Sequence, residues 1–118
     1  MDRCVKRGEI WTVAGGPDYG GKPGPVAIVQ DDRFEDLLSL TFCPFTTNPT
    51  PAPLFRLPVE PSQSNGLNER SSLMVDKITT AARAKIGKRV GRLDDEDLVR
   101  LNRAIVVFFG LGGGSPKA

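Results

Sequence analysis

The sequence contains no histidine, and this absence removes more kinds of chemistry than any other feature of its composition. Without imidazole the chain can build neither a Ser-His or Cys-His nucleophilic pair nor a paired-imidazole acid-base site. The usual zinc sites are excluded as well, because two cysteines cannot fill a tetrahedral shell by themselves. Any chemistry must therefore be carried by carboxylates, hydroxyl groups, lysines or arginines, and neither a metal nor another cofactor is expected.

Cysteines and long apolar runs are also scarce. Cys4 and Cys43 lie far apart in the chain and in unlike surroundings, so a disulfide framework is not expected. The N-terminus lacks the apolar core of a signal peptide, and the longest apolar run, residues 104–109, is far too short to span a bilayer. The sequence therefore predicts a protein of the cytoplasm without a membrane partner.

Aromatic residues are few, with six Phe, one Trp and one Tyr, whereas the chain has 13 Gly and 10 Pro. In 118 residues this composition predicts a single domain with a small core, many turns and short strands. The net charge is only +2, from 16 basic and 14 acidic residues, so the chain is not a polybasic nucleic-acid binder. RNA, if it is the ligand, must bind in a local groove.

A glycine-rich loop leads directly into an apolar strand between Tyr19 and Gln30. Residues 26–29 are apolar without alternation, which is the pattern of a strand buried on both faces. Glycines in the preceding loop free the backbone, while Pro23 and Pro25 restrain it. We therefore expect a mobile loop, Gly15 to Gly24, carried by a rigid strand, an arrangement typical of a functional site.

Short strands are predicted along most of the chain. They cover residues 8–13, 26–29, 38–45, 55–59, 71–75 and 88–93. Pro44 indicates a bulge or an edge position in the third of these strands. Residues 31–36 are predicted to form a solvated loop rather than an acidic site, residues 46–53 a stiff proline-rich loop, and residues 79–85 a short helix or turn.

One helix is predicted with a clear beginning and end. Asp94 can cap it, acidic residues follow in the first turn, where the macrodipole favours anions, and Gly110 ends it. Its apolar residues at helical spacing are Leu98, Leu101, Ile105 and Phe108. Further apolar residues on its other sides predict contact with more than its own sheet, which is one of two reasons to expect a homodimer; the other is the family resemblance described below. Residues 1–111 are predicted to form the domain and residues 112–118 a disordered tail.

Five short segments follow one another at compatible spacing: Arg7-Gly8-Glu9-Ile10-Trp11; GGK-P-x-P-V; Pro44-Phe45-Thr46-Thr47; Gly66-Leu67 with Ser72 and Val75-Asp76; and a helix ending in Gly110-Leu111. Together, over nearly the whole chain, they resemble the MazF/PemK family of toxin endoribonucleases. The resemblance implies a mainly β fold with α, a small SH3-like antiparallel β-barrel of the MazF, PemK and CcdB type with a C-terminal helix. It also implies a metal-independent, sequence-specific endoribonuclease of a toxin-antitoxin system, acting on single-stranded RNA.

The resemblance assigns roles to particular residues. Thr46 matches the catalytic threonine of the family, and Asp76 matches its acidic residue. The residues expected at the RNA are Glu9, Lys22, Gly24, Gln30, Thr47, Asn48 and Phe55. A cognate antitoxin is the second implied partner, through a disordered acidic C-terminal segment that folds across the same groove. On the residues alone, Thr46 is more typical of a turn before Asn48-Pro49, and Asp76 of a strand-end acid paired with Lys77 or Arg83.

The chain departs from the family at one position. The family has Arg-Pro at the start of this strand and the sequence has Gly24-Pro25, so the residue that in the family contacts the scissile phosphate is missing. Lys22 supplies positive charge nearby but cannot replace a bidentate guanidinium. Three accounts of Gly24 are open. It is a substitution that allows a toxic protein to be expressed, or the chain is a catalytically silent member of the family, or another cation takes the place of the arginine. The first account is favoured because every other motif is intact.

Two other functions are open on the sequence. One is an SH3-like binding module without catalytic activity. The other is a gyrase poison on the same barrel, in the manner of CcdB, against which the GGK-P-x-P and Thr46-Thr47 segments argue.

Overall fold

The computed structural model describes residues 4–14, 24–49, 51–52 and 54–112. Its elements are β1 (Glu9–Val13), β2 (Gly24–Ile28), η2 (Asp32–Phe34), β3 (Ser39–Thr46), β4 (Arg56–Val59), β5 (Ser71–Met74), η3 (Val75–Lys77), β6 (Thr79–Ala82), η4 (Arg83–Lys85), β7 (Ile86–Arg92) and α1 (Asp95–Phe108). The six predicted strands and the helix are thereby confirmed, with boundaries that differ by a few residues. Most of the loop expected to be mobile, residues 15–23, and the tail from residue 113 lie outside the described residues.

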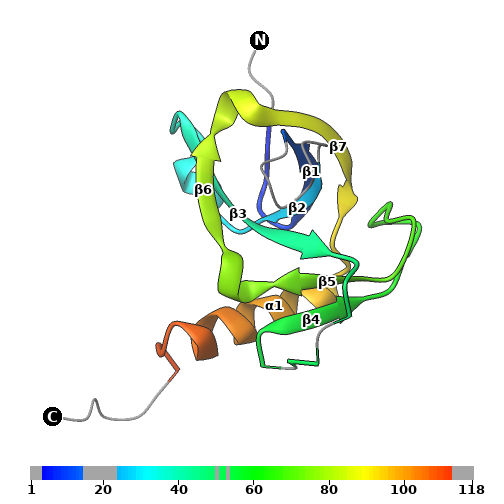
Figure 1. Cartoon of the computed structure of the whole chain (residues 1–118). Helices are drawn as coiled ribbons and strands as arrows, with labels where there is room; N and C mark the ends of the chain where they lie inside the picture. Colours follow the sequence, from blue (N-terminus) through cyan, green and yellow to red (C-terminus); the bar gives the residue numbers. More distant parts are fainter. Residues whose placement is uncertain (1–3, 15–23, 50, 53, 113–118) are drawn as a thin grey trace, which may run out of the picture.

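The strands pair antiparallel in the order β4-β5-β3-β2-β1-β7, and β6 pairs with β3 beside this path. Figure 1 shows the sheet curling around a common centre, with α1 lying along β4 and β5 at one end. Within the described residues β4 and β7 do not pair with each other, so the barrel expected from the resemblance is a strongly curled but open sheet.

The central strands are buried on both faces. Ala27 and Cys43 belong to the core cluster that α1 covers through Leu101. Val26 and Ile28, which alternate with Ala27 along β2, belong to the second cluster inside the curl of the sheet. A strand with a core on each side has no polar face, and this explains the apolar run without alternation.

Helix α1 ends as the sequence predicts. Gly110 has a positive φ of 72°, its N–H donates to the Val107 carbonyl at 3.1 Å, and the Leu111 N–H donates to the Val106 carbonyl at 2.9 Å. These two bonds form a Schellman motif, which satisfies carbonyls of the last turn. At the other end, Asp94 occupies the N-cap position with extended backbone but caps no N–H; its carboxylate accepts from the Ser62 hydroxyl at 3.2 Å.

Two local predictions are wrong. Residues 79–85 contain a strand, β6, followed by the single turn η4, because residues 79–82 find hydrogen-bond partners on β3 that the local sequence does not reveal. Pro44 lies in a strand with neighbours on both sides rather than at an edge or a bulge. On one side of β3 it falls between the residues paired with β6 and those paired with β5, where no ladder requires its missing N–H.

The charged stretch after β2 is a solvated turn, as predicted. Residues 31–34 are exposed, and Asp31 caps η2 by accepting a hydrogen bond from the Arg33 N–H at 2.9 Å. The Arg33 side chain pairs with the same carboxylate at 3.2 Å, so these charges are used locally.

Candidate functional site

Thr46 lies at the end of β3, in a row of residues that crosses three strands. The register pairs Thr46 with Ser72 on β5 and Ser72 with Pro58 on β4. The alternate row, Phe45, Leu73 and Leu57, is buried in the core against α1. Because successive side chains of a strand point to opposite faces, Thr46, Ser72 and Pro58 lie on the face of the sheet away from the helix.

An open groove of about 270 Å³ runs over this row. Its lining residues are Thr46, Thr47, Pro49, Pro51, Pro58, Arg70, Ser71 and Ser72. Hydroxyl groups, proline rings and one guanidinium thus share the groove. This is a surface that can donate hydrogen bonds to an anion and pack against flat apolar groups.

The Thr46 hydroxyl is prepared to donate a hydrogen bond. Its Oγ1 accepts from the Asn48 backbone N–H at 3.1 Å, which orients the side chain and uses one of its lone pairs. A threonine hydroxyl has one proton besides its two lone pairs, so the proton remains available for a ligand oxygen. Thr47 and Asn48 are exposed beside it.

Gly24 and Thr46 are brought together by the sheet. The register of β2 and β3 pairs Ala27 with Cys43 and Val26 with Pro44. The described pairs end there; the same register continued by two residues would place Gly24, the first residue of β2, across from Thr46, the last residue of β3, and on the same face. Opposite residues in an antiparallel pair are roughly 5 Å apart. A side chain at position 24 would therefore lie directly beside the Thr46 hydroxyl.

Asp76 does not join this row. It lies in η3, four residues beyond Ser72, and it is not among the residues that line the groove. Both of its oxygens are bound by Arg56, with Nε to Oδ1 at 2.7 Å and Nη2 to Oδ2 at 3.0 Å. The hydrogen bonds from Arg56 lower the pKa of Asp76 and raise the pKa of Arg56. The carboxylate is thus held ionised and occupied.

Two other expected RNA contacts are engaged in local structure. Glu9 accepts from the Lys6 N–H at 2.8 Å and from the Trp11 indole at 3.1 Å, and pairs with Arg89 at 3.1 Å. Gln30 donates to the Phe34 carbonyl at 2.9 Å and accepts from the Thr41 N–H at 3.2 Å. Lys22 lies outside the described residues.

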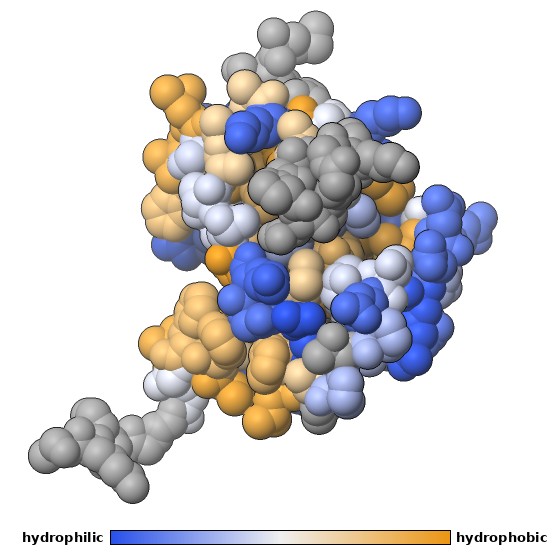
Figure 2. Space-filling model, in the orientation of Figure 1, coloured by the Kyte–Doolittle hydropathy of each residue, from blue (hydrophilic) through white to orange (hydrophobic). Residues whose placement is uncertain are grey.

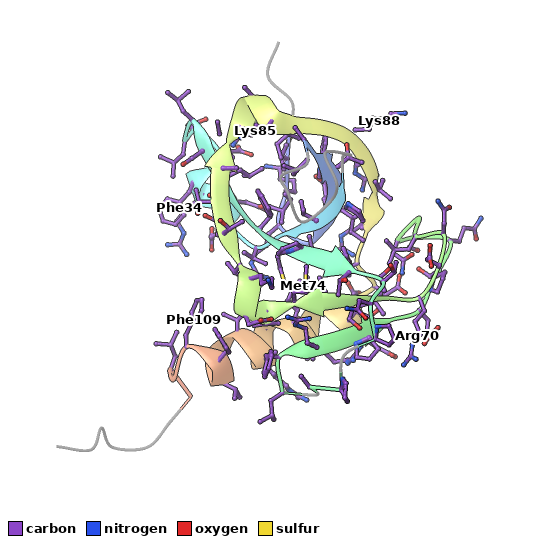
Figure 3. All side chains as sticks on the ribbon, in the orientation of Figure 1. Phe34, Arg70, Met74, Lys85, Lys88 and Phe109 are labelled. Atoms are coloured by element: carbon purple, nitrogen blue, oxygen red, sulfur yellow. The ribbon has the colours of Figure 1, made fainter. Side chains whose placement is uncertain are left out.

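Phe55 lies at the other end of the β4–β5 layer from the groove. Its ring contacts Phe108 of α1, with centroids 6.1 Å apart, and the Arg56 guanidinium lies 5.9 Å from its centroid. Figure 3 shows Phe109, which contacts Phe108, and Arg70 on opposite sides of this view. Neither Phe55 nor Asp76 is among the residues that line the groove with Thr46.

The sequence reasoning missed three polar residues, Arg56, Arg70 and Ser72, as partners in these arrangements. A signal for two of them exists in hindsight: Arg56 and Ser72 alternate with buried Leu57 and Leu73, so their side chains had to lie on the opposite face. The local sequence does not show which strands pair, and therefore does not show which residues come together.

Other reactive groups supply no competing centre. Burial raises the pKa of the Cys43 thiol to about 12, so this cysteine is a packing residue, and Cys4 is an exposed free thiol. Among the residues that the structure describes, no three His, Cys, Asp or Glu side chains gather as metal ligands. No helix in the described part of the chain is long and apolar enough to cross a membrane.

Comparisons with known proteins show what the chain is similar to. Residues 6–109 match the family described as PemK-like, MazF-like toxin of type II toxin-antitoxin system. The chain is 50% identical over 109 residues to a Mycolicibacterium smegmatis protein named "Probable endoribonuclease MazF", covering 92% of this chain and 100% of that protein. Its fold is similar to the Mycobacterium tuberculosis toxin MazF-mt6, with a TM-score of 0.73 and 26% identity over 86% of this chain and 96% of the other. It is also similar to a mycobacterial endoribonuclease in complex with its cognate antitoxin, with a TM-score of 0.75 and 19% identity over 96% and 100% of the two chains.

Proposed function

Since this chain belongs to the PemK-like, MazF-like toxins of type II toxin-antitoxin systems, we propose how its residues serve that activity. The protein is a toxin endoribonuclease. Its proposed substrate is single-stranded RNA, bound in the groove over Thr46. The observation that carries this assignment is the Thr46 hydroxyl, held by the Asn48 N–H with its own proton free to donate, beside position 24 and within a hydroxyl-lined groove.

Metal-independent cleavage of RNA proceeds by attack of the 2′-oxygen on the adjacent phosphorus and departure of the 5′-oxygen. The phosphorane between these steps carries extra negative charge on its non-bridging oxygens, and preorganised donors there contribute most of the stabilisation. We propose that Thr46 donates to one of these oxygens. Thr47 and Asn48 are proposed to contact the neighbouring nucleotides.

Gly24 itself brings no cation to the β2 side of Thr46. An arginine there would reach the same phosphate and supply two parallel donors, which neither a hydroxyl nor a lysine reproduces. Loss of one such donor costs about two to three orders of magnitude in rate. We therefore propose that the chain with Gly24 is a weak nuclease.

Asp76 is proposed to act indirectly, by holding the side chain of Arg56. A carboxylate that receives two hydrogen bonds from a guanidinium and has a lowered pKa is a poor proton acceptor near neutral pH. It is well suited to fix the Arg56 guanidinium and the end of β5. Glu9 and Gln30 are proposed to support the site by fixing the strand ends, as their hydrogen bonds indicate.

The proposed partners follow from the same site. A groove built for a polyanionic backbone also favours the acidic, disordered segment of a cognate antitoxin, which would block the substrate by folding across it. A second copy of the chain is proposed to cover the apolar residues at the end of α1. We place the activity in the cytoplasm, where messenger RNA is available.

The decisive experiment is incubation of purified wild-type and Gly24→Arg protein with a mixed-sequence single-stranded RNA, with and without EDTA. We expect faint cleavage by the wild type and strong cleavage by Gly24→Arg, with the same fragments when EDTA is present. A folded Gly24→Arg protein that leaves the RNA intact would contradict the catalytic assignment. Cleavage that EDTA abolishes would contradict the metal-independent mechanism.

A further inference from the structure

The groove beside Thr46 contains an arginine that none of the family segments includes. Arg70 lies immediately before β5, and its side chain lines the same groove as Ser72 and Thr46. Since Ser72 pairs with Thr46 across β5 and β3, Arg70 enters the groove from the β5 side of Thr46, whereas β2 lies on the other side of β3.

The Arg70 side chain is only loosely committed to its present partner. Its Nε lies 2.7 Å from Oε2 of Glu60, and the two side chains are 64% and 70% exposed. Ion pairs this exposed contribute little to stability and exchange readily with solvent. A phosphate can replace the Glu60 carboxylate, because a guanidinium binds both anions with the same fork of parallel donors.

The neighbouring hydroxyl groups complete a set of donors. Within the part of the chain that the structure describes, the Ser72 side chain makes no hydrogen bond, and the Thr46 hydroxyl retains its proton. By contrast, Ser71 donates to the Glu69 carbonyl at 3.0 Å. Arg70, Ser72 and Thr46 therefore line one groove with donors that an oxyanion can accept.

We propose that Arg70 and Ser72 form a binding subsite for a phosphodiester of single-stranded RNA, adjacent to the phosphate at Thr46. This inference rests on the proposed function. In the empty groove Glu60 holds Arg70. When RNA binds, the phosphate takes the guanidinium and Glu60 is released to solvent. Arg70 thereby supplies from β5 part of the positive charge that Gly24 no longer provides from β2.

The composition of the groove favours RNA over an acidic peptide. Its described lining residues offer several hydroxyl donors and one cation, which suits one phosphate charge per site rather than a run of carboxylates. The rings of Pro49, Pro51 and Pro58 give it flat apolar walls that can pack against ribose and base. Figure 2 shows hydrophilic residues over the loop between β4 and β5, on the Arg70 side of the molecule, and a further hydrophilic patch at the centre of the view, whereas the end of α1 is apolar.

The test measures binding of a fluorescent 2′-O-methyl RNA of mixed sequence, which has no free 2′-hydroxyl and cannot be cut. Anisotropy titrations at several salt concentrations compare wild type with Arg70→Ala, Arg70→Lys and Glu60→Gln. We expect Arg70→Ala to weaken binding about 5-fold or more and to reduce the salt slope by about one phosphate contact. Arg70→Lys should retain part of the affinity, and Glu60→Gln should tighten binding because the guanidinium is freed.

Arg33→Ala is the matched control, because Arg33 is also an exposed arginine paired with a carboxylate, but in η2. If Arg70→Ala and Arg33→Ala lose the same RNA affinity while circular dichroism shows that both are folded, the proposed subsite is overturned. Arg70-dependent binding of a poly-glutamate peptide without any effect on the RNA would overturn its assignment to phosphate. The proposed nuclease activity is judged separately, since Arg70-dependent RNA binding can hold even where Gly24→Arg fails to cut RNA.

Discussion

Arg56 and Asp76 form a two-point ion pair, with Nε to Oδ1 at 2.7 Å and Nη2 to Oδ2 at 3.0 Å, across the junction of β4 and η3. The side chains are only 13% and 23% exposed, so the pair is better shielded from water than the other ion pairs among the described residues. It fixes the segment that follows β5, and its strength should appear in the pH dependence of stability.

Asp76→Asn should lower the free energy of unfolding at pH 7 by about 1 to 2 kcal/mol, because Arg56 is left partly buried without its charged partner. The folded pKa of Asp76 lies below its ordinary value of 3.8, so the ionised form stabilises the fold. That contribution is complete above the ordinary pKa and is lost as the pH falls through the folded pKa.

The measurement is urea unfolding of wild type and Asp76→Asn from pH 7 to pH 3. The difference between the two proteins should shrink toward the acid end. Glu60→Gln, which breaks an exposed ion pair, is the control and should change the unfolding midpoint little. If the difference in unfolding free energy between the two proteins stays constant over this pH range, the ionisation of Asp76 is not linked to the stability of the fold.

Asp76 should not determine the pH–rate profile of cleavage. In the Gly24→Arg background, Asp76→Asn is expected to reduce kcat/KM less than 10-fold and to leave the shape of the profile unchanged, because the carboxylate is already occupied by Arg56. The measurement is single-turnover cleavage between pH 5 and pH 9. Disappearance of one limb of the profile would instead identify Asp76 as a proton-transfer group.

Thr46→Ala in the Gly24→Arg background should reduce the cleavage rate by about 100-fold, the usual effect of removing one donor to a developing oxyanion. Thr46→Ser keeps the hydroxyl and should retain most of the activity. Thr46→Ala also removes the acceptor of the Asn48 N–H, whereas Thr46→Ser keeps it, so binding of the 2′-O-methyl RNA checks that the groove is intact in both variants. Equal activity of the alanine and serine variants would rule out a donor role.

Gly66→Ala and Gly110→Ala should differ strongly although both glycines have positive φ, 68° and 72°. A Cβ at Gly66 would lie 2.2 Å from the Val90 carbonyl oxygen, whereas a Cβ at Gly110 would meet nothing within 4 Å. Gly110→Ala should therefore cost about 1 kcal/mol of conformational strain, and Gly66→Ala more than about 3 kcal/mol. Thermal unfolding of the two variants measures this, and similar losses would contradict the steric argument.

The end of α1 should form a dimer contact. Its exposed apolar residues are Val106, Val107, Phe108, Phe109 and Leu111, and Figure 2 shows apolar surface over this end of the helix. Phe109→Glu should convert the dimer to a monomer in sedimentation velocity at micromolar concentration, because a buried glutamate has no partner there. Asn102→Glu, at an exposed position of the same helix, is the control. A wild-type monomer at this concentration would contradict the assignment.

Local rules determined much of the fold from the sequence. Apolar periodicity placed α1, and Gly110 marked its end because only a residue at ease with positive φ completes the Schellman motif. The unalternating run of β2 predicted burial on both faces, and the two core clusters confirm it. These features depend on residues close together in the chain, so composition and spacing reveal them.

The relationships that build the site depend on pairing between distant strands. The sequence by itself determined that a threonine would lie at the end of β3 and that position 24 carries no cation. Only the tertiary structure decided that Thr46 and Ser72 pair across two strands, that Arg70 lines the same groove, that Asp76 binds Arg56, and that residues 79–82 form β6. Strand register is the physical reason: it is fixed by which apolar faces meet across the sheet, and a shift of one residue would point every one of these side chains to the opposite face.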